Sequence, residues 1–286
     1  LARRQLGEYV RAAFAHDTGT AALYLAALLE GRLRVDALKE LLLETRDWRT
    51  LLGERLAPHG GRLAALLGDA ESHQVVLRAA AACEDSGRME DAIALYEEAR
   101  SLDKALDLYC LQLGRLLFAQ RGEEVRGAQL PTALQHARLF RQRLDQQRTH
   151  LRDPGARAPF EQLLLVADAR VAYEQREWVR ADNTLQEANV LPLGAADERT
   201  VQQCIAAFPS LHTVIRTHIG ALLELAMRIL LERHRAEVRG TASAPAAGGS
   251  STRARARALI HYATQIPYNL SVETQQHLLD MEAQMG

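Results

Sequence analysis

Apolar residues recur along this chain at three- and four-residue steps, the spacing that aligns them on one face of an α-helix. Ala and Leu dominate the apolar set while aromatic residues make up only 5%. This balance favours helix, because strands prefer β-branched and aromatic side chains. No segment alternates apolar and polar residues convincingly, so we expect an all-α fold without a sheet. The clearest periodic series is Leu211, Val214, Ile215, His218, Leu222, Leu225, Ala226, Ile229 and Leu230.

This periodic series predicts one long helix. Pro209 stops any preceding helix, and Ser210 is a natural N-cap. The helix is predicted to run to about Arg239, which corresponds to roughly 40 Å at about 1.5 Å per residue. Such a length suits a stacked layer better than a compact bundle.

Caps and prolines mark the starts of other helices. Asp17 or Thr18 is a candidate cap, and Pro131 and Pro159 fit the first turns of two further helices. The elements predicted in this way are helices over 20–30, 132–151 and 160–175, and connections over 153–155 and 190–195.

Helical hairpins are the recurrent unit. Residues 75–87 and 88–100 form one predicted pair, with Gly87 as the turn, and 160–175 and 178–188 form another. Their facing positions carry small residues, which let two helices approach closely. The spacing resembles tetratricopeptide packing but lacks that repeat's fixed period of about 34 residues. The sequence therefore predicts an irregular α-solenoid of stacked hairpins. The facing positions are Ala79, Ala82, Cys83, Ala92, Leu95, Tyr96 and Ala99, then Ala167, Val171, Ala181 and Leu185.

Length and composition bound the class of protein. The 286 residues, 48% apolar and 25% charged, are enough for one large or two ordinary domains. A net charge of −1 argues against direct nucleic-acid binding through phosphate contacts. The longest apolar stretch, over 21–29, is far shorter than the about 20 residues of a membrane span, so no transmembrane segment is expected. The chain starts at Leu1 rather than Met, and we expect it to be a portion of a longer protein.

The end of the chain is predicted to be a helical cap. Residues 240–252 are rich in Gly, Ser and Pro and are expected to be a flexible loop within one domain over 1–286. Residues 253–286 after it are too few to fold alone. They contain two short helices separated by the breaker 266–268, and Ser271 is placed to cap the second. Tyr268 is expected to pin the breaker against the preceding layer.

No catalytic, cofactor-binding or metal-binding residues are identified, and the chain is not expected to be an enzyme. His212 and His218 lie on different helix faces, so a ligand role is disfavoured. Cys83 is expected to be a buried structural thiol. The three cysteines, the other two being Cys110 and Cys204, show neither a disulfide framework nor a zinc spacing, which suits a reducing compartment.

Charged and aromatic residues receive structural interpretations as well. Arg253, Arg255 and Arg257 alternate with Ala, so at most two share a helix face, and solvated surface is favoured over a binding role. Core packing is favoured over an interface role for Trp48 and Trp178. The acidic pairs Glu97-Glu98 and Glu123-Glu124 are expected to be solvated helix faces.

Three stretches resemble the C-terminal part of the nucleoporin-interacting-component family, the inner-ring scaffold or linker nucleoporins of the nuclear pore complex. They cover residues 80–117, 190–234 and 256–285. The shared order is an alanine-rich hairpin, a "PL" connection at 192–193, an "AAF" stretch at 206–208, a low-complexity loop and a close from "IPY" at 266–268 to "MEAQM". A single AIxLYxxA segment would be weak evidence for this family, but the order of these features along the chain is fairly specific for it.

The resemblance implies a scaffold role. The family's fold is similar to the ancestral coatomer elements, and its members localise to the nuclear pore complex at the nuclear envelope. The implied partners are the large solenoid nucleoporins, the FG-repeat channel complex and a membrane-associated linker nucleoporin whose motif docks on the solenoid. Most of them use parts of the protein outside this chain. The alternative function is a cytosolic tetratricopeptide-like adaptor or vesicle-coat subunit, which the same hairpins would support.

Overall fold

The structure is a computed structural model that describes residues 2–53, 61–118, 124–147, 151, 153–194, 197–240 and 251–285. All regular elements in these ranges are helical, which confirms the predicted all-α fold. The chain divides into two compact units, Leu1–Leu108 and Tyr109–Gly286, and each is described by itself. The single domain over 1–286 stays a prediction.

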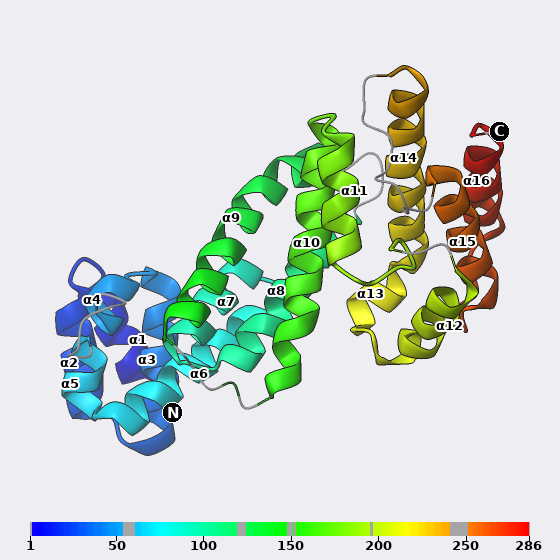
Figure 1. Ribbon diagram of the computed structural model, residues 1–286. Helices are drawn as coiled ribbons and strands as arrows, with labels where there is room; N and C mark the ends of the chain where they lie inside the picture. The colour runs from blue at the N-terminus through cyan, green and yellow to red at the C-terminus, as the bar shows by residue number, and fades with distance from the viewer. Residues whose placement is uncertain are drawn as a thin grey trace. The chain divides into compact units, whose positions relative to one another are not determined.

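The first unit consists of helices packed against one another, drawn in blue and cyan (Figure 1). Asp17 caps α2, because its Oδ1 accepts a hydrogen bond from the Thr20 backbone N–H at 3.0 Å. Thr18 is the first residue of that helix, which therefore begins two residues earlier than predicted. The elements are α1 (Ala2–Ala13), α2 (Thr18–Leu28), α3 (Gly31–Thr45), α4 (Trp48–Leu52), α5 (Arg62–Leu67), α6 (Asp69–Asp85), α7 (Met89–Glu98) and the start of α8 (Leu102–Leu117).

Helices α6 and α7 form the hairpin that the sequence predicts. Gly87 turns the chain in a left-handed conformation with φ 73°. There the Arg88 N–H bonds the Cys83 carbonyl and the Gly87 N–H bonds the Glu84 carbonyl, so the last carbonyls of α6 are satisfied. The predicted facing residues are buried apart from Ala82, which is half-buried, and the adjacent Ala80 is fully buried as well.

The second unit runs from α8 to the end of the chain, and α14 stands between α11 on one side and α15 and α16 on the other (Figure 1). Its elements are α9 (Glu124–Gln147), the 3₁₀ turn η1 (Pro154–Ala156), α10 (Arg157–Glu174), α11 (Trp178–Glu187), α12 (Glu198–Ala207), the 3₁₀ turn η2 (Phe208–Ser210), α13 (Thr213–Thr217), α14 (Ile219–Val238), α15 (Thr252–Gln265) and α16 (Val272–Ala283).

Aromatic and small residues build the interior of this unit. Tyr109, Phe140 and Phe160 bring α8, α9 and α10 together, with the rings of Tyr109 and Phe140 stacked at 4.9 Å. The predicted pair of α10 and α11 is also present. The small residues Ala167 and Ala181 are fully buried on these two helices, as their spacing predicts.

The prediction of one long helix from Ser210 is wrong about where the helix begins and about its being continuous. Ser210 belongs to η2, and its hydroxyl donates to the Ala207 carbonyl at 2.6 Å. His212 is the cap instead, because its Nδ1 accepts from the Val214 N–H at 3.3 Å. The helix is then interrupted at His218, which separates α13 from α14. The apolar spacing continues across the break, so periodicity alone does not reveal it.

The helix predicted to start at Pro131 begins earlier. α9 starts at Glu124 and carries Pro131 inside it, where the missing N–H removes one backbone hydrogen bond. Leu130 and Leu134 are both buried, so the apolar stripe crosses the proline and keeps the helix packed on either side. Pro159, in contrast, lies in the first turn of α10 as predicted.

Most of the predicted loop over 240–252 lies outside the described residues. The prediction is wrong for the last residue of this loop, Thr252, because Thr252 is the first residue of α15 and is only 2% exposed. The two helices predicted over 253–286 are present as α15 and α16. Ser271 caps α16 as predicted, accepting from the Thr274 N–H at 3.1 Å.

Candidate functional site

The strongest concentration of buried charge in the described residues surrounds Asp182 on α11. This carboxylate is 1% exposed and accepts hydrogen bonds from Arg233 of α14 and Arg255 of α15, which are 8% and 4% exposed. One of these bonds joins Arg255 Nη1 to Asp182 Oδ2 at 2.8 Å. Three helices that are distant in sequence therefore meet at one side chain.

A second acid extends the cluster. Glu237, in the last turn of α14, accepts from Arg233 Nε at 3.0 Å and from the Thr252 hydroxyl at 3.2 Å. The Thr252 hydroxyl also lies 3.0 Å from Nδ1 of His234. Two guanidinium groups thus face two carboxylates. The end of α14 and the start of α15 are joined by side chains as well as by the chain between them.

The electrostatic balance keeps Asp182 ionised. Burial alone would raise the pKa of this carboxyl group. The hydrogen bonds and charges of Arg255 and Arg233 outweigh burial and hold the pKa below its ordinary value. A paired buried charge of this kind adds little net stability relative to apolar packing, but removing one partner is costly. The cluster therefore fixes which surfaces of α11, α14 and α15 meet.

The prediction that Arg255 is solvated surface is wrong. The alternation with Ala places Arg253 and Arg257 on one face, where their Nε atoms lie 3.6 and 3.0 Å from Glu282 Oε1 of α16. Arg255 points to the opposite side, toward Asp182. Sequence reasoning did not single out Asp182, although it shares the inward stripe of α11 with Ala181 and Leu185.

The breaker between α15 and α16 is held as predicted. The Tyr268 hydroxyl donates to the Thr217 carbonyl at 3.0 Å, and its ring meets Phe208 edge-on at 6.4 Å. Thr217 ends α13, so Tyr268 takes up a carbonyl freed by the helix break at His218. The break and the terminal cap are thus parts of one contact.

The outer face of α16 is mostly polar, although Val272 and Leu279 are also exposed, whereas Leu278 and Met281 are buried on its inner face. Helix α16 thus covers an apolar layer with its inner face, and the role of terminal cap stays a prediction. The exposed polar residues are Glu273, Gln275, Gln276, His277, Asp280 and Gln284.

The singled-out histidines and cysteines are not brought together. His218 stacks on Phe118 with ring centroids 4.8 Å apart, and burial lowers its pKa. Cys83 is fully buried in the α6–α7 hairpin, and burial raises the pKa of its thiol. A buried thiol of raised pKa is a poor nucleophile. Within the described ranges, no group of three or more His, Cys, Asp or Glu is placed to hold a metal ion.

The tryptophans are only half-buried, contrary to the core positions predicted for them. Trp178 begins α11 and rests against Tyr173 of α10, with ring centroids 5.3 Å apart. Trp48 begins the short helix α4 and borders a groove of about 390 Å³ in the first unit. The other groove residues are Arg49, Leu52, Gly53, Ala94, Leu95 and Glu98.

The first of the two acidic pairs takes a different place from the one expected, and the prediction for Glu123-Glu124 stays a prediction. Glu97 and Glu98 are half-buried at the end of α7, rather than on a fully solvated face. Glu124 begins α9, and Glu123 lies outside the described residues. None of the described helices is both long and apolar enough to cross a membrane.

Comparison with known proteins places the chain in a family. The Nic96 family model, described as Nup93/Nic96, matches residues 2–277. The zebrafish (Danio rerio) nuclear pore complex protein Nup93 is 25% identical over 86% of this chain and 30% of its own length. Nucleoporin NIC96 of Chaetomium thermophilum is 26% identical over 77% of this chain and 24% of its own length. The chain therefore spans less than a third of these curated relatives.

A solved structure shares the fold. The crystal structure of Chaetomium thermophilum Nic96 SOL matches 98% of this chain and 46% of its own chain, with a TM-score of 0.76 at 20% identity. Because the family model extends almost from end to end, it also includes residues 2–79, which precede the first of the three resembling stretches. The chain belongs to the Nup93/Nic96 family.

Proposed function

We propose that this chain is a structural part of the nuclear pore scaffold, located in the inner ring at the nuclear envelope. The observation that carries the proposal is the family match over residues 2–277, in a chain whose described residues form stacked helices. Its role is to bind other nucleoporins and so to support pore assembly and nucleocytoplasmic transport. The work is mechanical rather than catalytic.

Rigidity is the physical basis of the mechanism. Layers of helices with small residues at their crossings are held in fixed register, as Ala79, Ala92, Ala167 and Ala181 illustrate. The buried ion cluster around Asp182 adds a directional contact between distant segments. Extended helical stacks of this type present long surfaces on which short segments of partner proteins bind.

The partners proposed are the large solenoid nucleoporins, the FG-repeat channel complex and the motif of a membrane-associated linker nucleoporin. Because the chain covers 30% or less of the two relatives quoted, most of these contacts are assigned to other parts of the full protein. The linker motif is the partner assigned to the helical stack itself, where grooves between helices suit a short amphipathic segment.

A pull-down with the 286-residue chain as bait tests this function. Nucleoporins identified by mass spectrometry are expected to co-purify, and an unrelated helical-repeat protein of similar size and charge serves as the control bait. Enrichment of vesicle-coat subunits in place of nucleoporins would favour the alternative of a coat or adaptor protein. An eluate with the same composition as the control would count against the proposed binding role.

A further inference from the structure

Helix α16 has an exposed apolar stripe, although it packs against α14 and α15 (Figure 1). Val272 is 80% exposed and Leu279 is 51% exposed. A single exposed apolar side chain is ordinary on a surface helix, but side chains seven residues apart lie on the same face, two turns apart. The exposed residues Gln276 and Ala283 lie on that face as well. We define the α16 stripe as Val272, Gln276, Leu279 and Ala283.

The spacing of the α16 stripe is that of a helix–helix contact. Its residues follow one another at steps of four, three and four, the pattern by which one helix faces another in a coiled coil. The stripe holds no charged residue over roughly 16 Å of helix, at about 1.5 Å per residue. It lies on the side opposite Leu278 and Met281, which are buried within this chain. Helix α16 therefore has a second side that is able to pack on a helix.

An acidic flank borders one edge of the α16 stripe. It consists of Glu273 and Asp280, which are exposed and seven residues apart. Within the described residues, neither carboxylate is paired with a Lys or Arg. Helix α16 itself contains no Lys or Arg, and Nδ1 of its His277 lies 3.7 Å from Oε1 of Glu224 on α14. On the opposite edge, in contrast, arginines of α15 neutralise the carboxylate of Glu282. The negative charge of the flank is therefore confined to one side of the stripe.

We propose that the α16 stripe docks an amphipathic helix of another protein, whose apolar side chains pack on Val272 and Leu279 and whose Lys or Arg residues face Glu273 and Asp280. The charge of the flank supports this occupant, because charges beside an apolar seam decide which helix pairs with it. A second copy of α16 offers no Lys or Arg to these carboxylates. The inference does not depend on the location proposed at the pore.

Two designed peptides and an exchange of charge test the proposal. Each peptide is a helix of about 18 residues with a Leu stripe, flanked by Lys in the Lys peptide and by Glu in the Glu peptide. Their binding to the 286-residue chain is measured by fluorescence anisotropy. The Lys peptide is expected to bind at least roughly tenfold more tightly than the Glu peptide. The double variant Glu273→Lys, Asp280→Lys is expected to reverse this preference, because its flank is positive.

Uncharged substitutions test the apolar part of the contact. Leu279→Gln is expected to weaken binding of the Lys peptide at least roughly fivefold. It should leave the melting temperature of the chain unchanged, because Leu279 is exposed. Val179→Gln is the matched control, since Val179 is 42% exposed on α11, on the other side of α14. Equal affinity of the two peptides for the parent chain, or a preference that survives the charge exchange, would overturn the proposal.

Photo-crosslinking in cells distinguishes the natural occupants. The photoreactive residue p-benzoylphenylalanine replaces Leu279 in the full-length protein, and the crosslinked peptides are sequenced by mass spectrometry. The expected product is a segment of another protein with apolar residues at three- and four-residue steps and Lys or Arg beside them. Crosslinks only to a second copy or only within the same protein would contradict the proposal. No more crosslinking than from the same probe at Val179 would contradict it as well.

Discussion

Asp182 is a fully buried carboxylate in an interior that is mostly apolar. It remains ionised because Arg233 and Arg255 surround its carboxylate. Its partners come from helices 51 and 73 residues further along the chain. We expect the cluster to favour one arrangement of α11, α14 and α15, because any other arrangement would leave a buried charge unpaired.

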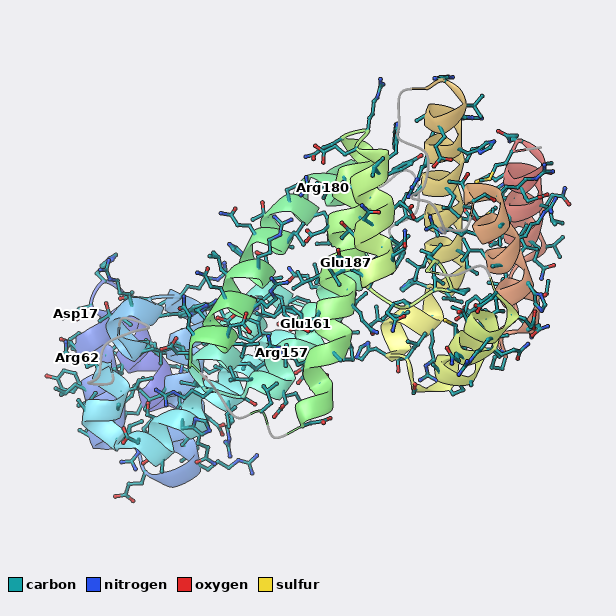
Figure 2. All side chains as sticks on the ribbon, in the orientation of Figure 1. Asp17, Arg62, Arg157, Glu161, Arg180 and Glu187 are labelled. Carbon is teal, nitrogen blue, oxygen red and sulfur yellow. The ribbon has the colours of Figure 1, made fainter. Side chains whose placement is uncertain are left out.

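Replacement of this carboxylate is expected to destabilise the chain strongly. Asp182→Ala leaves Arg255 buried without its counter-ion, and this should lower the free energy of unfolding by about 3–5 kcal/mol. Urea denaturation followed by circular dichroism measures the loss. Arg180→Ala is the matched control on the same helix, because Arg180 is exposed and lies 2.7 Å from the exposed carboxylate of Glu177 (Figure 2). Equal midpoints for the two variants would contradict the importance of the cluster.

Two hairpin turns of the same geometry allow a pair of substitutions that are expected to change stability in opposite directions. Gly87 and Arg176 both have positive φ, 73° and 63°, at the ends of α6 and α10. A side chain is disfavoured in that conformation, so Gly87→Ala should destabilise by about 1 kcal/mol. Arg176→Gly removes existing strain and should leave stability equal or slightly higher. Thermal melts check the two directions, and a Gly87→Ala variant as stable as the parent would refute the turn assignment.

At the scale of elements, the hairpins and the terminal cap were predictable and the helix break was not. Gly87, Asp17 and Ser271 act through residues within four positions of themselves, so their local signals are readable in the sequence. The break at His218 and the burial of Arg255 depend on contacts across 51 and 73 residues. Neither the spacing of apolar residues nor the alternation of Arg with Ala carries that information.

Tyr268 links the terminal cap to the break between α13 and α14. Tyr268→Phe removes its hydrogen bond to the Thr217 carbonyl but keeps the ring contact with Phe208. The loss expected is about 1 kcal/mol, since Tyr268 is part-exposed and water can replace its hydroxyl. Hydrogen exchange should show faster opening of the backbone around residues 266–272 and no change in α6–α7. Uniformly faster exchange would point to a global rather than a local effect.

At the scale of the whole molecule, we expect the protonation of Asp182 to control how much stability the chain loses in acid. Its pKa in the folded chain lies below the ordinary value of 3.8. The ionised form therefore contributes its full stabilisation above that value and loses it as the pH falls below 3.8 toward the folded-state pKa. As the pH falls from about 4 toward the folded-state pKa, the melting temperature of the parent should drop more steeply than that of Asp182→Asn. Parallel curves would show that other carboxylates govern acid unfolding.

The candidate binding surfaces were the least predictable part of the molecule. The groove beside Trp48 is lined by apolar residues together with Arg49 and Glu98, which are ordinary residue types for a helical chain. The sequence contains no recognised catalytic or ligand-binding motif, so no residue could be identified from it as part of a site. Family membership, in contrast, follows from the order of many weak features along the chain.

The location of the full-length protein in living cells tests the scaffold function most directly. A fluorescently tagged version, expressed from its own locus, is expected to give a punctate rim at the nuclear envelope that coincides with other pore components. A diffuse cytosolic signal, or vesicular puncta without a nuclear rim, would contradict a role in the nuclear pore.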